Sequence, residues 1–148
     1  MDPPGFEPGS KAPNALRMSA DVAIRARGAS LGQLFANAAW GMFDLICDSA
    51  TVEPHRTWEV EVSSPDLEGL MVDLLTDMLV LFETDGMLAS SIEVDVTTVE
   101  DRWRAVAKVR GEPYDGDRHE LLHDIKAATY HTLEVRPDEG WARVLFDI

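Results

Sequence analysis

Apolar residues recur every three to four positions in two long segments, and this spacing predicts two amphipathic helices. The first helix follows Ser30, a good N-cap, and its apolar positions are Leu31, Leu34, Phe35, Ala38, Met42 and Ile46. For the second helix we expect Ser64 as N-cap and Pro65 at the first helical position, with an end near Asp85-Gly86. Its apolar stripe consists of Leu67, Leu70, Met71, Leu74, Met78, Leu79 and Phe82.

Alternation of apolar and polar residues predicts strands in the segments around these helices. The strands run from Val22 to Ala26, Thr57 to Ser63, Leu88 to Val96, Trp103 to Val109, Leu133 to Arg136 and Trp141 to Phe146. The third and fourth are joined by a short polar turn and the last two flank Asp138-Glu139-Gly140, so both pairs favour antiparallel pairing. Between Gly111 and Leu133 the pattern leaves the elements open. We predict an α+β fold, mainly an antiparallel sheet with two amphipathic helices packed on it.

The length of 148 residues suits a single domain. Residues 1–14 hold four of the eight prolines and show neither helical nor strand periodicity. We expect a disordered tail there and one folded domain over residues 15–148. A misassigned start codon would account for such a tail.

The charge balance narrows the choice of partners and location. With 27 acidic and 13 basic residues the net charge is −14, so the mean surface potential disfavours direct binding of nucleic acid. Charged residues interrupt the apolar stretches, and the N-terminus lacks the features of a signal peptide, which argues against a membrane span or export. Cys47 is the single cysteine, so no disulfide forms within the chain. A soluble, cytoplasmic protein is expected.

One short motif, His119-Glu120-Leu121-Leu122-His123, fits the zinc-peptidase pattern of two histidines one helical turn apart with a glutamate that activates water. That chemistry needs a helix and a third ligand, for which His131 or Glu134 is available in principle. The competing interpretation is a pair of apolar residues flanked by charged ones. We keep His119 and His131 as a possible secondary site.

Carboxylates gather at the C-terminus, where the last predicted strand runs to within two residues of the chain end. That strand would hold the Asp147 side chain and the Ile148 α-carboxylate in place, both charged at neutral pH. Hard oxygen ligands of this kind suit Ca²⁺, Mg²⁺ or Mn²⁺. The alternative is a solvated acidic end.

Many short blocks, in the same order, make the sequence from about Ala20 to Ile148 resemble the archease family. They include Ala20-Asp21-Val22, Val52-Glu53-Pro54, Leu81-Phe82-Glu83-Thr84, Gly111-Glu112, Tyr114-Asp115, Arg118-His119-Glu120, Ile125-Lys126-Ala127, Thr129-Tyr130-His131, Leu133-Glu134-Val135 and Phe146-Asp147-Ile148. The resemblance implies an α+β protein that is not an enzyme and that activates the RtcB-type RNA ligase of tRNA splicing and RNA repair. The resemblance further implies that such a protein promotes guanylylation and multiple turnover of that ligase.

The resemblance also implies a site for a divalent metal, Ca²⁺ in the first instance, formed by Asp21, Asp147 and Ile148. An alternative role attached to the family is a chaperone-like modulator of RNA-modifying enzymes such as a tRNA methyltransferase. One departure is visible, because Arg17-Met18-Ser19 stands where archeases usually carry Asp-His-Thr.

Overall fold

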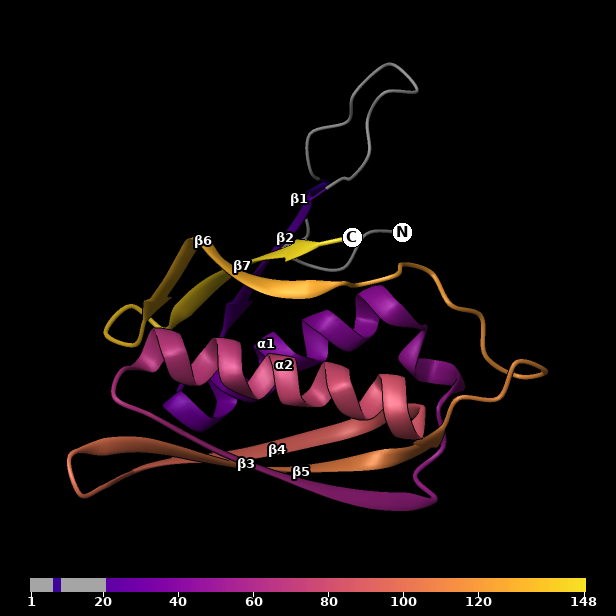
Figure 1. The fold of residues 1–148 in the computed structure, drawn as a ribbon, viewed down its shortest axis with the longest axis horizontal. Helices are drawn as coiled ribbons and strands as arrows, with labels where there is room; N and C mark the ends of the chain where they lie inside the picture. Colours follow the sequence, from indigo (N-terminus) through magenta and orange to yellow (C-terminus); the bar gives the residue numbers. More distant parts are fainter. Residues whose placement is uncertain (1–6, 9–20) are drawn as a thin grey trace.

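The computed structural model describes residues 7–8 and 21–148. They form two antiparallel sheets with two helices between them (Figure 1). One sheet has the strand order β1-β2-β7-β6 and the other β3-β5-β4. The elements are β1 (Glu7–Pro8), β2 (Asp21–Arg27), α1 (Leu31–Ile46), the short 3₁₀ helix η1 (Ser49–Thr51), β3 (Arg56–Ser64), α2 (Leu67–Asp85), β4 (Met87–Val99), β5 (Arg102–Pro113), β6 (Ala127–Arg136) and β7 (Trp141–Asp147).

Each helix contacts both sheets. Helix α1 packs mainly on β2 and β4, whereas α2 packs mainly on β3 and β6. The predicted apolar stripes are buried, or half-buried at Leu31, Leu67 and Phe82. Further buried positions lie outside these stripes, namely Ala39, Phe43 and Leu45 in α1 and Val72 and Leu75 in α2. A helix between two sheets needs a second apolar face, which explains these positions. The α+β class is confirmed, and the division into two sheets adds to it.

The start of α2 differs from the prediction. Ser64 is the last residue of β3, and Asp66 is the N-cap, with its carboxylate accepting a hydrogen bond from the Gly69 N–H at 2.6 Å. Both residue types cap helices well, but extension of the strand through Ser64 moves the first helical residue to Leu67. The end agrees, since Gly86 closes α2 in the left-handed conformation with φ 71°.

The predicted strand pairs are confirmed and extended. β4 pairs with β5 and β6 with β7, both antiparallel. The segment left open contains the end of β5, an irregular stretch from residue 114 to 126, and the start of β6. β6 carries a long bulge, because its register against β7 shifts between Thr129 and Glu134, and Thr132 inside it has φ 52°. None of the helices in the described part of the chain is both long and apolar enough to cross a membrane.

Two predictions fall largely outside the described residues. Within the predicted tail only Glu7 and Pro8 are described, and they pair as β1 with β2. Arg17-Met18-Ser19 lies in the undescribed part. The tail and the effect of that departure stay predictions.

Candidate functional site

The two aspartates predicted as metal ligands stand directly opposite each other in the sheet. In the antiparallel pair of β2 and β7, Asp21 is the register partner of Asp147. Directly opposed residues on one face of such a pair hold their Cβ atoms about 4.5–5.5 Å apart. The residues that alternate with them, Val22 and Phe146, lie in the core, so both aspartates project from the outer face of the sheet.

In this acid pair, Asp21 and Asp147, the second residue is held by backbone contacts with β6 and with the residue that precedes this strand. Ala127 pairs with Asp147 from the other side, and the Lys126 N–H donates to the Asp147 carbonyl oxygen at 2.7 Å. Ile148 packs its side chain against the core. Among the described residues no ion pair reaches either aspartate side chain. Opposed like charges destabilise a sheet, so this arrangement favours a bound cation.

A second carboxylate site lies where β5 ends, around Glu112. This side chain is buried and accepts three hydrogen bonds, from the Arg118 guanidinium, from the Glu53 N–H at 2.8 Å and from His119 Nε2 at 3.0 Å. His119 Nδ1 accepts from the Asp115 N–H at 2.9 Å, so the ring proton sits on Nε2 and donates to Glu112. These bonds tie the loop after β5 to the segment that enters β3.

The bond from Arg118 is the main reason that the pKa of Glu112 is lowered to about 2. Burial acts in the opposite direction, and the bonds from Glu53 and His119 assist Arg118. Glu112 is therefore a charged group at neutral pH whose charge is already balanced inside the protein.

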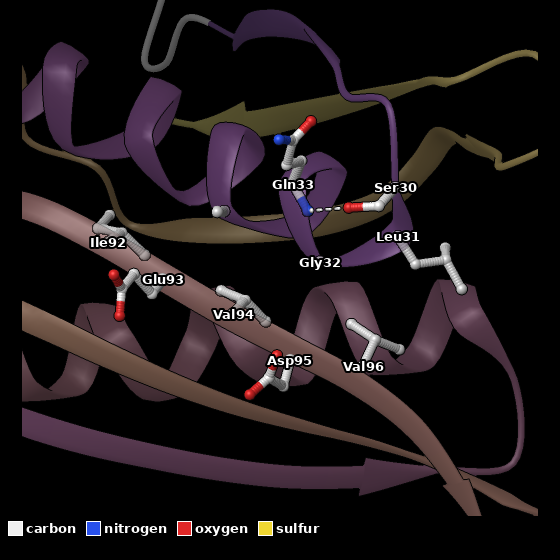
Figure 2. A pocket seen from close by; sticks show the side chains of 10 residues that line it. Ser30, Leu31, Gly32, Gln33, Ile92, Glu93, Val94, Asp95 and Val96 are labelled. Atoms are coloured by element: carbon white, nitrogen blue, oxygen red, sulfur yellow. Dashed lines mark hydrogen bonds between the residues drawn. The ribbon is translucent and has the colours of Figure 1, made fainter.

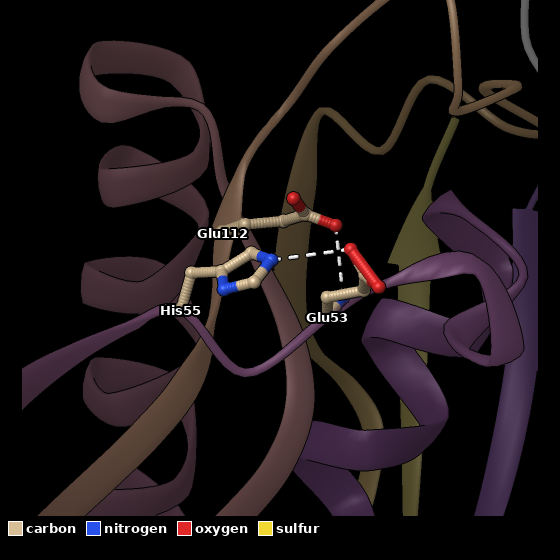
Figure 3. A group of neighbouring side chains, drawn as sticks. All are labelled: Glu53, His55 and Glu112. Atoms are coloured by element: carbon tan, nitrogen blue, oxygen red, sulfur yellow. Dashed lines mark hydrogen bonds and ion pairs between the residues drawn. The ribbon is translucent and has the colours of Figure 1, made fainter.

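Glu112 also belongs to a group that has metal-ligand geometry. Ligand atoms of Glu53, His55 and Glu112 all lie within 4.8 Å of one another (Figure 3). Arg118, however, lies against both carboxylates, 3.5 Å from Glu53 Oε2 and bonded to Glu112. A divalent ion here would have to displace that guanidinium. The spacing allows a metal, but the charge balance favours a structural network.

The two histidines that the sequence suggested have different environments in the structure. His119 is buried with both ring nitrogens bonded, and His131 is exposed on the bulge of β6. The stretch from His119 to His123 is not helical, so it lacks the support that a zinc peptidase requires. A secondary site at His119 and His131 remains a prediction.

A shallow groove of about 450 Å³ lies between the start of α1 and the edge strand β4. Figure 2 shows the start of α1, at Ser30 and Leu31, next to Ile92, Val94 and Val96 of β4. None of the predicted site residues lines the groove. Gly32 is required there, because an added Cβ would lie 2.3 Å from the Val94 carbonyl oxygen.

The class of protein is thus an α+β domain with two helices between antiparallel sheets and an acid pair at one sheet end. The chain belongs to the archease family: the model of the Archease protein family (MTH1598/TM1083) matches residues 14–148. Similar proteins named protein archease occur in Thermococcus gammatolerans and Methanopyrus kandleri. The first is 36% identical over 83% of this chain and 88% of the relative, and the second is 39% identical over 82% and 87%.

A solved relative has the same fold. The solution structure of Methanobacterium thermoautotrophicum protein 1598 superposes with a TM-score of 0.78 at 29% identity, covering 97% of this chain and 99% of that chain. The family resemblance seen in the motif blocks is confirmed.

Sequence reasoning missed the network around Glu112. The blocks Gly111-Glu112 and Arg118-His119-Glu120 were visible, and they contain its acid, its cation and its imidazole. A signal was therefore present, but no periodicity showed that the two blocks meet.

Proposed function

We propose that this protein is an accessory protein that activates an RtcB-type RNA ligase by promoting its guanylylation and multiple turnover. The observation that carries the proposal is membership of the archease family over residues 14–148. The net charge of −14 supports a protein partner, because an acidic surface complements the basic RNA-binding cleft of a ligase. In this role the protein itself catalyses no reaction and acts in the cytoplasm.

The proposal includes a divalent cation, Ca²⁺ in the first instance, held by Asp21, Asp147 and the α-carboxylate of Ile148. The donor set fits, because it consists of hard oxygen atoms that Ca²⁺ accepts. The cross-strand register supports it as well, since Asp21 and Asp147 oppose each other without a cation from the described side chains. A bound ion would supply charge compensation and fix the strand ends.

The test is multiple-turnover ligation of RNA by the cognate ligase. Wild-type protein should raise both the guanylylated fraction of the ligase and the number of turnovers. Asp21→Ala and Asp147→Ala should each lose this stimulation. Asp95→Ala is the matched control, because Asp95 is an exposed strand aspartate on the other sheet.

The outcomes separate the parts of the proposal. If wild-type protein leaves guanylylation and turnover unchanged, activation is refuted. The alternative role, a chaperone-like modulator of RNA-modifying enzymes, is then favoured. If stimulation survives both substitutions in the acid pair, activation stands and the metal site does not. A loss in the Asp95 control would point to a general effect of surface charge.

A further inference from the structure

The acid pair shares the outer face of its sheet with an arginine cluster. Four residues beyond Asp21 along β2, Arg25 is the register partner of Arg143 on β7. This corresponds to about 13 Å along the strand. Arg27 projects from the same face, and Ala26 beside it lies in the core. One sheet face therefore carries like charges at both ends, negative at one and positive at the other.

The arginine face is defined as Arg25, Arg27, Arg136 and Arg143, and its acidic neighbours Glu134, Glu139 and Glu68 act on Arg136. Glu134 is the register partner of Arg143, but its carboxylate accepts two bonds from Arg136, at 2.9 and 3.1 Å. Arg143 is half-buried and has contacts within the molecule, whereas Arg25 and Arg27 are exposed. Among the described residues no ion pair reaches Arg25 or Arg27, so these two guanidinium groups are the ones available to an anion.

An aromatic ring holds one of these arginines in place. The Arg25 guanidinium lies 4.9 Å from the ring centroid of Trp141, the register partner of Arg27. This cation–π contact keeps the guanidinium over the sheet and lowers the entropy lost on binding a ligand. Guanidinium groups bind phosphate through paired N–H donors.

We propose that the arginine face binds the phosphate backbone of single-stranded RNA. Net charge predicted no direct contact with nucleic acid, but that quantity averages over the whole surface, whereas binding depends on the local potential. The choice of RNA over another polyanion rests on the proposed function, because an RNA ligase brings RNA next to its partner. The binding itself needs no ligase. Its affinity is expected on the order of 10–100 µM at physiological salt.

The experiment measures fluorescence anisotropy of a labelled single-stranded RNA with the full chain and without ligase. Arg25→Gln combined with Arg27→Gln should weaken binding by about tenfold and lower the slope of log affinity against log salt by roughly 1.4. Arg102→Gln combined with Arg104→Gln is the matched control, since it removes the same charge from β5 on the other sheet. Thermal unfolding of all variants verifies that they fold.

The control variant should bind RNA within about twofold of the wild type, because its arginines lie away from the arginine face. Absence of RNA binding by the wild type, or equal losses in both variants, overturns the proposal. Tighter binding of a polyglutamate peptide than of RNA also overturns it, in favour of an acidic protein partner. If the Arg25 and Arg27 variant loses RNA binding but still stimulates the ligase, the RNA site is separate from the ligase contact. If the wild type binds no RNA but stimulates the ligase, only the RNA site is refuted and the proposed function stands.

Discussion

Glu112 and the Asp21–Asp147 pair are both carboxylate sites, but they differ in where their counter-charge comes from. Glu112 is buried and meets the guanidinium of Arg118 and the imidazole of His119 within the chain. The two aspartates face each other across β2 and β7, and no described side chain forms an ion pair with them. The first site is complete as a structural element, whereas the second is the one at which we propose a bound cation.

This difference decides which cluster is expected to respond to metal. Spacing of ligand atoms alone selects Glu53, His55 and Glu112, whose atoms come within 4.8 Å of one another. Coulombic balance favours the proposed site at Asp21 and Asp147 instead, because no ion pair from the described residues compensates these two carboxylates. Proximity of carboxylates is thus a weak guide to a metal site until the neighbouring cations are counted.

The largest effect is expected from Glu112→Gln. The substitution removes the charge that Arg118 and His119 bond, and hydrogen bonds to charged groups contribute more than neutral ones. The free energy of unfolding should fall by about 2–3 kcal/mol, measured by urea denaturation. Glu93→Gln on β4, an exposed glutamate, should change it by less than about 0.5 kcal/mol. Equal values for the two variants would show that the network around Glu112 adds no stability.

The same site predicts a dependence of stability on acid. The pKa of Glu112 lies at about 2 in the folded protein against an ordinary value of 4.5. A lowered pKa gives stability that is complete above the ordinary value and is lost as the pH falls through the folded value. Thermal midpoints should therefore drop between pH 4.5 and 2 in the wild type and drop less steeply in Glu112→Gln. Parallel curves for both proteins would assign the acid sensitivity to other groups.

A smaller effect is expected from metal at the acid pair. Addition of Ca²⁺ at about ten times its dissociation constant should stabilise the wild type by about 1.4 kcal/mol. Asp147→Asn should abolish most of this gain, and Glu112→Gln should retain it because its site is internally balanced. Calorimetric unfolding with and without chelator makes the measurement. Loss of the calcium response in Glu112→Gln alone would move the metal to the Glu53, His55 and Glu112 group.

The smallest effect is expected from a substitution that stabilises the protein, in contrast to Glu112→Gln. In the presence of chelator, Asp21→Asn removes the repulsion from Asp147 and should stabilise the protein by about 0.2–1 kcal/mol. Asp95→Asn, which faces Val106 instead of an acid, should show no such gain. Destabilisation by Asp21→Asn under chelator would mean that the acid pair is compensated within the protein itself.

Much of the fold could be predicted because its signals are local. Helix α1 begins after Ser30 and helix α2 ends at Gly86, as capping chemistry and periodicity indicated. The error at the start of α2 came from two competing caps, since Ser64 and Asp66 both accept N–H groups. Only the length of β3 selects between them, and strand length depends on the partner strand β5.

The candidate site was predictable only in part. Asp147 and Ile148 stood out as carboxylates at the end of a predicted strand, and Asp21 entered through the family resemblance. That Asp21 is the register partner of Asp147 could not be read from periodicity, because strand order is a long-range property. The arginine face was hidden for the same reason, since Arg25 and Arg143 are far apart in the chain.

By itself the sequence determined the helices, most strands, the acidic charge and the family, because each depends on neighbouring residues or on ordered motifs. Tertiary structure alone decided which charges meet. It placed Arg118 and His119 against Glu112, and it left Asp21 opposite Asp147 on an outer sheet face. The physical reason is that electrostatic energy depends on distance and burial, and both are set by the pairing of strands that are remote in sequence.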